Sequence, residues 1–503
     1  MSDAVAEVCT NAHTLALHWL NQDRLRRASL LEAIAAALDA RREEVLRVAS
    51  EETALTIEEL APEFARMVNT LRFYAGIVRE GSWVRAAIDR ARANPAEAIG
   101  PNHDLRRMLV PRGVVAVFGA SNFPLAYGVC GGDTASALAA GCPVVVKEHP
   151  AHPRTGRLVH ETALGAVASL PGSAEWSTRP GFVLGYVRNE DPADYSVAKA
   201  LVQNPVIQAV GFTGSKKAGL ALETLARERR TIHGGEDPIP VYAEMGSCNP
   251  VFVTARAAEK RGEAIARDIA SSILARHGQQ CTKPGLIFVE ELSRFPRFRE
   301  VLVEAFKASR PRRMLAPWVA ASFRARLEAC MSARGVSVLA TAERGSDAET
   351  TAPVLLGCSY AEWVAQPALQ EEVFGPASIL IDTPRGMLGA YAEMPARLAS
   401  AWFFEPEETG NWPGPWFRVQ SGRTCFNTVT TGVRVAHSMV HGGPFPATNR
   451  LDTTAVGPFA LERWCHPVCF QNAPQEALPD ELKDENPLGI GRLEDGVFVP
   501  RRG

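Results

Sequence analysis

The first hundred residues place apolar side chains at the three- and four-residue spacing of amphipathic helices. Two such faces consist of Leu30, Leu31, Ile34 and Leu38, and of Phe64, Val68, Leu71, Ala75 and Val78. Thr56 precedes Glu59 by three residues, the spacing of a capping box, so a helix is predicted to begin at that point. The N-terminal part of the chain is therefore expected to form a helical layer.

A different pattern begins at residue 113, where short runs rich in β-branched and aromatic residues alternate with helical stretches. The first set is "GVVAVFGA", "CPVVVKEH", "GFVLGYV" and "QAVGFTG", and the second is "IPVYAEMG", "PVFVTA", "GLIFVE" and "PASILID". Near-continuous apolar runs are typical of parallel strands that are buried on both faces. The pattern predicts an α/β fold with two α/β domains, preceded by a linker or arm at about residues 92–110.

The composition of the chain and its charge balance indicate which classes of binding partner to expect. The 503 residues are 46% hydrophobic, and 54 basic against 56 acidic side chains give a net charge of -2. No nucleic acid partner and no affinity for anionic lipid are therefore expected, and small molecules or further copies of the chain are the favoured partners. Without a signal pattern or an 18-residue apolar run, we expect a cytoplasmic protein with no membrane insertion. The ten cysteines show no paired spacing, which favours reduced thiols.

The stretch "VGFTGSKKAG" is a candidate anion site. A strand that ends at Phe212, a turn at Gly214 and Ser215, and a helix that begins near Lys216 and contains Gly219 would point free backbone N–H groups at a ligand. The same residues also suit plain helix capping, and the sequence alone does not choose between the two.

Lys147 stands just past the carboxyl end of a predicted strand, where open α/β sheets bind ligands. A dinucleotide with a 2′-phosphate needs a cation near its adenosine ribose and is repelled by a carboxylate. The residue three positions beyond Lys147 is Pro150 rather than an acid. The alternative is that Lys147 is a solvated surface lysine.

Two further polar residues follow predicted strands. Asn122 lies in a turn, with Pro124 at the opening of the next helix, and its amide can either donate to a developing oxyanion or stabilise the turn. Glu244 ends the run "PVYAE", where an apolar setting suits a general base, although a surface salt bridge is equally open.

Cys281 lies in "HGQQCTKPG", on a loop between a helix predicted over residues 259–277 and the strand "GLIFVE". Its polar neighbours suit an accessible thiolate better than a core thiol, although one cysteine among ten is most often a small hydrophobe. An amide donor, a candidate base and a candidate phosphate turn at other strand ends favour a nucleophilic role.

The stretches "GASNFPLAYGVCGGDTASALAAGCPVVVKEHPAHPRTG", "VGFTGSKKAG", "YAEMGSCNPVF", "GQQCTKPGLIF" and "EEVFGP" occur in that order. Together they resemble the motif series of the aldehyde dehydrogenase superfamily. The resemblance is strongest to its NADP-preferring branch, which includes α-ketoglutaric semialdehyde dehydrogenases and a bacterial fatty aldehyde dehydrogenase. It runs from about residue 25 to about residue 475.

The resemblance implies a catalytic role for three of these residues. Cys281 would attack the aldehyde carbon, and Asn122 together with the Cys281 backbone N–H would hold the oxyanion. Hydride transfer to the nicotinamide would leave a thioester, and Glu244 would activate the water that hydrolyses it. A soft nucleophile, an oxyanion donor and a separate base are what this acyl chemistry requires.

The resemblance also implies a cofactor site for NAD or NADP. The matched positions are Gly214, Ser215 and Gly219 under the pyrophosphate, Lys147 near the adenosine ribose, and Glu372 with Phe374 at the nicotinamide ribose. Pro150 in place of an acid leans toward NADP. Arg188 is either a second cation for the 2′-phosphate or a solvated side chain.

His437 and His441 stand four residues apart, as in a helical metal pair. The two glycines that follow His441 break any helix, and no Glu-x-x-His context is present, so no metal site is expected. In the resembling branch this stretch lies beside the substrate tunnel, so His441 is expected either to contact substrate or to pack.

The expected architecture is an aldehyde dehydrogenase-like fold with a Rossmann-type cofactor domain, an α/β catalytic domain and a small oligomerisation arm. The cofactor domain is placed at residues 1–243, with the arm at about 92–110 and a returning segment at about 425–470. The catalytic domain is placed at residues 244–424 and an oligomerisation tail at 471–503. A homodimer or homotetramer is expected.

A carboxylated semialdehyde such as α-ketoglutaric semialdehyde is the expected substrate. Three alternatives remain open from sequence: a long-chain aliphatic aldehyde, a CoA-acylating reaction, and a non-catalytic scaffold that keeps the fold. The base Glu244 speaks against the CoA-acylating reaction, and the joint presence of Asn122, Glu244 and Cys281 speaks against the scaffold.

Overall fold

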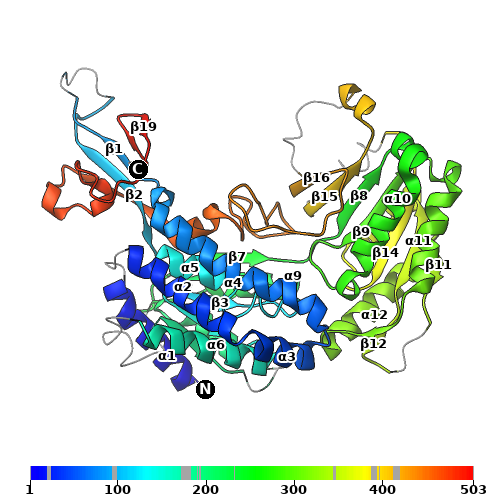
Figure 1. Ribbon diagram of the computed structural model, residues 1–503, viewed down its shortest axis with the longest axis horizontal. Helices are drawn as coiled ribbons and strands as arrows, with labels where there is room; N and C mark the ends of the chain where they lie inside the picture. The colour runs from blue at the N-terminus through cyan, green and yellow to red at the C-terminus, as the bar shows by residue number, and fades with distance from the viewer. Residues whose placement is uncertain are drawn as a thin grey trace.

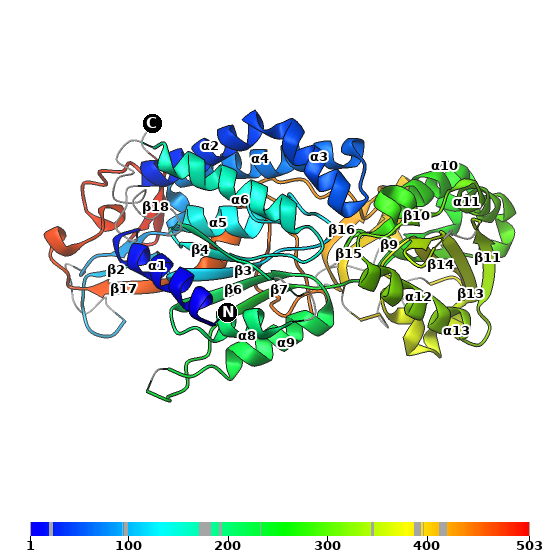
Figure 2. The same ribbon diagram turned by 90° about the horizontal axis from the view of Figure 1, so that it is seen from below.

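The computed structural model confirms the α/β fold, with two sheets in separate lobes and a five-stranded sheet in an arm (Figures 1 and 2). Strands β10 (Arg312–Arg313) and β12 (Thr350–Thr351) pair in a further, two-stranded sheet. It describes residues 2–19, 24–92, 94, 99–170, 183–189, 191, 194–231, 233–343, 347–386, 394–395, 397–411 and 420–501. Parts of the predicted arm and tail, at 93, 95–98 and 502–503, lie outside these residues.

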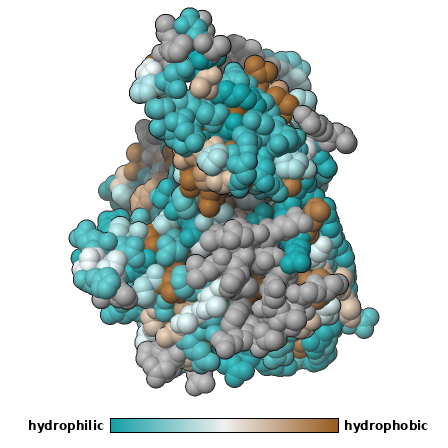
Figure 3. All heavy atoms as spheres, turned by 90° about the vertical axis from the view of Figure 1, so that its left-hand side faces the viewer, coloured by the Kyte–Doolittle hydropathy of each residue, from teal (hydrophilic) through white to brown (hydrophobic). Residues whose placement is uncertain are grey.

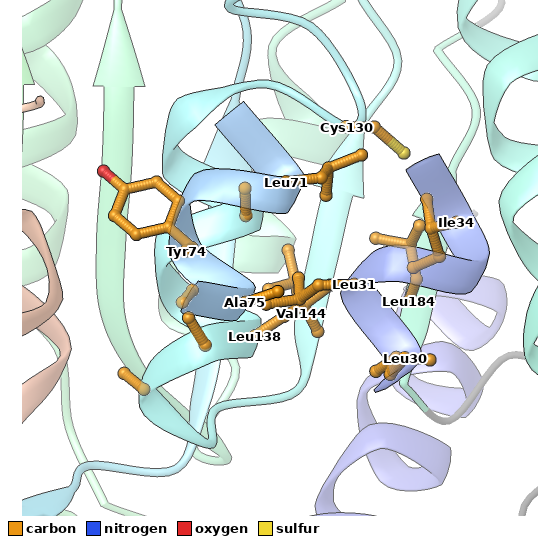
Figure 4. Packing of buried hydrophobic residues seen from close by; sticks show 14 of the residues in the cluster. Leu30, Leu31, Ile34, Leu71, Tyr74, Ala75, Cys130, Leu138, Val144 and Leu184 are labelled. Carbon is orange, nitrogen blue, oxygen red and sulfur yellow. The ribbon is translucent and has the colours of Figure 1, made fainter. Parts of the chain in front are cut away.

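The predicted N-terminal helical layer is confirmed. It consists of α1 (Ser2–Trp19), α2 (Arg24–Ala40), α3 (Arg42–Thr53) and α4 (Ile57–Glu80). Thr56 accepts a hydrogen bond from the Glu59 backbone, and the Glu59 carboxylate accepts one from the Thr56 backbone, so the capping box fixes the start of α4. The apolar faces of α2 and α4 are buried in one cluster with residues of the first sheet, as Figure 4 shows for Leu31, Leu71 and Val144.

The first sheet is entirely parallel and has the strand order β5-β4-β3-β6-β7. Its strands are β3 (Val114–Phe118), β4 (Val144–Lys147), β5 (Leu184–Val187), β6 (Ile207–Thr213) and β7 (Val241–Glu244). The connecting helices are α5 (Gly132–Ala140), α6 (Pro153–Ala168), α8 (Ser196–Gln203) and α9 (Lys216–Arg227). The chain runs outward from β3 in one direction and from β6 in the other, so a ligand crevice is expected between the carboxyl ends of these two strands.

The second sheet has the order β11-β13-β14-β9-β8-β15-β16 and is parallel except for β11. Its strands are β8 (Asn249–Val253), β9 (Pro284–Glu290), β11 (Ser337–Thr341), β13 (Val354–Ser359), β14 (Ala377–Thr383), β15 (Arg397–Phe403) and β16 (Ser421–Phe426). Helices α10 (Ala255–Leu274) and α11 (Pro296–Ala308) pack with one apolar cluster of this lobe. Helices α12 (Pro317–Met331) and α13 (Tyr360–Val364) belong to the other cluster.

The boundaries predicted for the helix before Cys281 were wrong at both ends. The helix α10 begins at Ala255 rather than at residue 259, because Thr254 caps it by accepting a hydrogen bond from the Ala257 backbone at 3.1 Å. It ends at Leu274 rather than at residue 277, because Arg276 and His277 adopt left-handed backbone conformations that an α-helix does not contain.

The third sheet forms the arm at the upper left of Figure 1. It joins β1 (Ala87–Asp89), β2 (Leu105–Pro111), β17 (Cys465–Gln471), β18 (Arg492–Glu494) and β19 (Val497–Val499). The face of the molecule that carries the arm is mostly hydrophilic, with separate apolar patches (Figure 3). The division into domains at residues 243 and 424 stays a prediction, although the strands on either side of residue 244 do belong to different sheets.

Candidate active site

The carboxyl ends of the first sheet bring four of the candidate residues to one edge. Lys147 and Phe212 both lie opposite Phe118 in the strand register, and Glu244 lies opposite Thr213. Asn122 follows β3 by four residues, and Gly214 follows β6 directly. This edge is the switch point of the sheet, where a dinucleotide is expected to bind.

The Cys281 loop has an unusual backbone. Arg276, His277 and Gly278 have φ values of 52°, 53° and 65°, a left-handed stretch that two of these residues enter only at a cost. Buried polar contacts hold it: the Arg276 guanidinium donates to the Glu63 carboxylate at 2.7 Å, and the His277 ring lies 3.0 Å from the Thr351 hydroxyl. These contacts hold the backbone that leads into Cys281.

The Glu63–Arg276 ion pair also holds the turn that contains Asn122. Arg276 donates to the Asn122 carbonyl at 2.7 Å, and the Glu63 carboxylate accepts from the backbone N–H groups of Leu125 and Ala126 at 2.8 and 3.1 Å. The Asn122 side chain donates to the Gln279 carbonyl at 3.1 Å. One buried ion pair thus joins α4, the Asn122 turn and the Cys281 loop.

Pro124 does not open a helix, so that prediction was wrong. Residues 124–127 form a turn, and the next helix, α5, begins at Gly132. The backbone is too tightly folded for a helix here, since a Cβ on Gly131 would lie 2.5 Å from the Ala126 carbonyl oxygen. The Glu63 carboxylate accepts hydrogen bonds from the first two N–H groups after Pro124, which would also lack partners at the start of a helix.

Cys281, His441 and Glu244 form a continuous hydrogen-bonded line. Cys281 Sγ lies 3.6 Å from His441 Nε2, and His441 Nδ1 lies 3.1 Å from Glu244 Oε2. The side chain of Cys281 is half-buried, whereas Glu244 and His441 are only 6% and 3% exposed. Glu244 is therefore not a surface salt-bridge partner, and Cys281 is not sealed in the core.

The charge state of His441 follows from its neighbours. Burial by itself lowers the pKa of His441, but Tyr127 and the hydrogen bonds with Cys281 and Glu244 outweigh it and raise the pKa well above its usual value. The raised pKa favours the protonated form of His441, whose Nε2 faces the Cys281 sulfur. The protonated imidazole is present below the raised pKa and is lost as the pH rises through it.

The sequence did not reveal this position of His441. Two glycines follow it, and a Cβ on either would lie 2.8 Å from a carbonyl oxygen, of Thr453 for Gly442 and of Arg397 for Gly443. The two adjacent glycines were the one feature of the sequence that indicated a tightly packed backbone beside His441. His437 instead packs its ring on Phe73 at 5.1 Å between centroids, and the absence of a metal site stays a prediction.

The turn that is expected to bind phosphate, at Gly214 and Ser215, is also the N-terminal cap of α9. Ser215 accepts a hydrogen bond from the Ala218 backbone at 3.3 Å and caps the twelve-residue helix α9. Gly219 lets α9 pack closely on the sheet, because a Cβ there would lie 2.9 Å from Met245 Sδ. Capping and anion binding are therefore compatible at this turn.

Glu372 and Phe374 lie just before β14, and both are half-buried. Burial raises the pKa of Glu372 to about 7, partly offset by Lys283. Its Oε1 atom is buried and has no hydrogen-bond partner within the part of the chain that the structure describes. A buried acceptor without a donor fits the hydroxyl of a ligand such as a ribose.

Lys147 is not a freely solvated lysine. It is half-buried, donates to the Glu148 carbonyl at 3.0 Å, and its pKa is lowered by burial to about 8. The buried Glu148 carboxylate forms an ion pair with Arg157, with 2.7 Å between Oε2 and Nε. The side chain of Arg188 is exposed, which agrees with the solvated alternative.

Comparisons with known proteins agree on one family. Residues 1–384 match the model described as "Aldehyde dehydrogenase family". An α-ketoglutaric semialdehyde dehydrogenase 2 of Azospirillum brasilense is 39% identical over 93% of this chain and 87% of its own length. An α-ketoglutaric semialdehyde dehydrogenase of Acinetobacter baylyi is 36% identical over 99% of this chain and 92% of its own length.

Solved structures share the fold at low sequence identity. A 1-pyrroline-5-carboxylate dehydrogenase superposes with a TM-score of 0.75 at 18% identity, over 93% of this chain and 86% of that one. Proline utilization A of Bradyrhizobium japonicum superposes with a TM-score of 0.76 at 20% identity. That match covers 94% of this chain but only 45% of the larger protein.

The Glu63–Arg276 pair can be tested through the order of the two loops it holds. In Glu63→Gln the Arg276 side chain, which is 10% exposed, loses its counter-charge, at a cost of about 3–5 kcal/mol, so both loops are expected to open more often. Hydrogen–deuterium exchange should quicken at least tenfold in peptides that cover residues 122–126 and 276–281. Glu58→Gln, an exposed position on the same helix, is the control; equal exchange in both variants would contradict the assigned role.

Proposed function

Because the chain belongs to the aldehyde dehydrogenase family and is an NAD(P)-dependent oxidoreductase, we propose that it oxidises a carboxylated semialdehyde, such as α-ketoglutaric semialdehyde, to the acid. The observation that carries the proposal is the line from Cys281 through His441 to Glu244, with Asn122 tied to the same loop. The two relatives that align with almost the whole chain support the choice of substrate.

We propose that Cys281 attacks the aldehyde carbon as a thiolate, with its proton already on His441. Glu244 accepts from His441 Nδ1, which keeps Nε2 aimed at the sulfur. The Asn122 amide has two N–H donors and uses one for the Gln279 carbonyl, so the other is available to the oxyanion of the tetrahedral adduct.

When bound, NAD(P) supplies the hydride acceptor that turns this adduct into a thioester on Cys281. The residues present fit the cofactor: the Ser215 turn offers N–H groups to the phosphates, and the unpartnered oxygen of Glu372 suits a ribose hydroxyl. Because His441 already carries the Cys281 proton, the Glu244 carboxylate then accepts the proton from the water that hydrolyses the thioester. The carboxylic acid leaves, and Cys281 is regenerated.

For the cofactor we propose NADP in preference to NAD. Lys147 lies at the carboxyl edge of the first sheet, and Pro150 stands where an acid would repel a 2′-phosphate. The neighbouring acid, Glu148, is neutralised by Arg157 at 2.7 Å. Arg188 is a candidate second cation near the 2′-phosphate.

We propose a homodimer or homotetramer that assembles through the arm sheet and the tail. Apolar side chains remain exposed there, with Val497 and Phe498 of β19 66% and 62% exposed. In the described ranges of the chain no helix is both long and apolar enough to cross a membrane. Location in the cytoplasm and the absence of a nucleic acid partner stay predictions.

The substrate class is tested by steady-state kinetics without CoA. Among α-ketoglutaric semialdehyde, pentanal and decanal, the semialdehyde is expected to have the highest kcat/KM, and Cys281→Ala is expected to lose at least a thousandfold in kcat. Cys469→Ala, at an exposed cysteine, is the matched control and should retain parental rates. A strict need for CoA, or a preference for decanal, would overturn the proposed reaction.

The role of Lys147 is tested by the pH dependence of cofactor binding. Because burial lowers its pKa to about 8, Lys147 is charged below that pH and loses its proton above it. The KM for NADP should therefore rise about five- to tenfold between pH 7 and pH 9, whereas the KM for NAD should stay nearly constant. Lys147→Met should abolish the difference; a parallel rise for both cofactors in the parent would argue against contact with the 2′-phosphate.

A further inference from the structure

The helix α4 presents a second functional side chain one turn beyond Glu63. Residues three apart on a helix lie on the same face, so Arg66 points in the direction of the Asn122 turn that Glu63 holds. Its contact confirms this placement: Arg66 Nη2 donates to the Tyr127 hydroxyl at 2.8 Å. The guanidinium also lies over the Tyr127 ring, 5.1 Å from its centroid.

Tyr127 connects Arg66 to the catalytic line. Its ring is only 7% exposed and lies between two residues of the site, with centroids 5.8 Å from His441 and 5.8 Å from Phe123. Phe123 directly follows Asn122. Tyr127 therefore lies between Arg66 and the imidazole that contacts Cys281. It belongs to the same turn as Asn122, the proposed oxyanion donor.

Other cations near the site are already neutralised or enclosed. Arg276 is paired with Glu63 at 2.7 Å, and the buried Arg463 is paired with Asp133 at 2.7 Å. Lys283 is buried and donates to the Val373 carbonyl at 3.0 Å. The two arginines are thus neutralised by acids, and the buried ammonium group of Lys283 is held by backbone carbonyls.

Arg66 is half-buried, whereas Arg463 and Lys283 are buried. Unlike Arg276 and Arg463, it forms no ion pair with an acidic side chain of the described residues. Only one of its five N–H donors is used by Tyr127, so a forked pair of donors remains for a carboxylate. An uncharged aliphatic chain laid over this guanidinium would desolvate it without compensation.

We infer that Arg66, aimed by Tyr127, binds the remote carboxylate of the substrate and so selects a carboxylated aldehyde over an uncharged one. The inference rests on the proposed function and names the side chain that determines its specificity. It concerns binding of the substrate's far end, and the chemistry at Cys281 does not require it.

The test is a selectivity ratio measured within each variant, so that a loss of folded protein cancels. The ratio is kcat/KM for α-ketoglutaric semialdehyde divided by kcat/KM for pentanal, which has the same chain length and no carboxylate. In Arg66→Met the ratio should fall about 10- to 100-fold, mainly through KM for the semialdehyde. Arg66→Lys keeps the charge but loses the planar pair of donors, so its selectivity ratio should lie between those of the parent and Arg66→Met.

The matched control is Arg72→Met, on the same helix, where the guanidinium is exposed and paired with Asp39 at 2.5 Å. It should keep the parental ratio. If the parent prefers the semialdehyde and Arg66→Met keeps that preference, the inference about Arg66 is overturned while the proposed function stands. If the parent itself prefers pentanal, both fall together.

Discussion

The contact of His441 with both Cys281 and Glu244 is the interaction on which the site depends. Glu244 ends a strand of the first sheet, Cys281 precedes a strand of the second, and His441 comes from a segment about 160 residues further along the chain. The imidazole of His441 therefore contacts residues of both lobes. Burial lowers the pKa of His441, but Tyr127 and the hydrogen bonds with Cys281 and Glu244 outweigh it and raise the pKa.

The helix α4 acts as the common support of this arrangement. Its capping box fixes where the helix begins, and one face then carries Glu63 and Arg66 to the Asn122 turn. Glu63 is buried and serves structure, since it neutralises Arg276 and satisfies backbone donors. Arg66 is half-buried and keeps donors for a ligand. The buried, paired Glu63 thus has a structural role, and the half-buried Arg66 on the same helix has a proposed role in binding.

Much of the fold and several site positions could be predicted from local pattern. The buried runs around β3, β6 and β9 identified parallel strands, and the capping box at Thr56 identified a helix start. The parts that were missed depend on distant contacts. Arg276 meets Glu63 across 213 residues, and His441 meets Cys281 across 160. Neither the left-handed loop that the first pair supports nor the second contact has a local signal as strong as a strand or a cap.

The most direct measurement of the central claim is the rate at which Cys281 reacts with iodoacetamide at pH 7, followed by mass spectrometry of its peptide. If an imidazolium at position 441 stabilises the thiolate, His441→Gln should slow this alkylation about tenfold or more, while the exposed Cys469 reacts equally fast in both proteins. Equal alkylation rates at Cys281 in the parent and the variant would contradict the account.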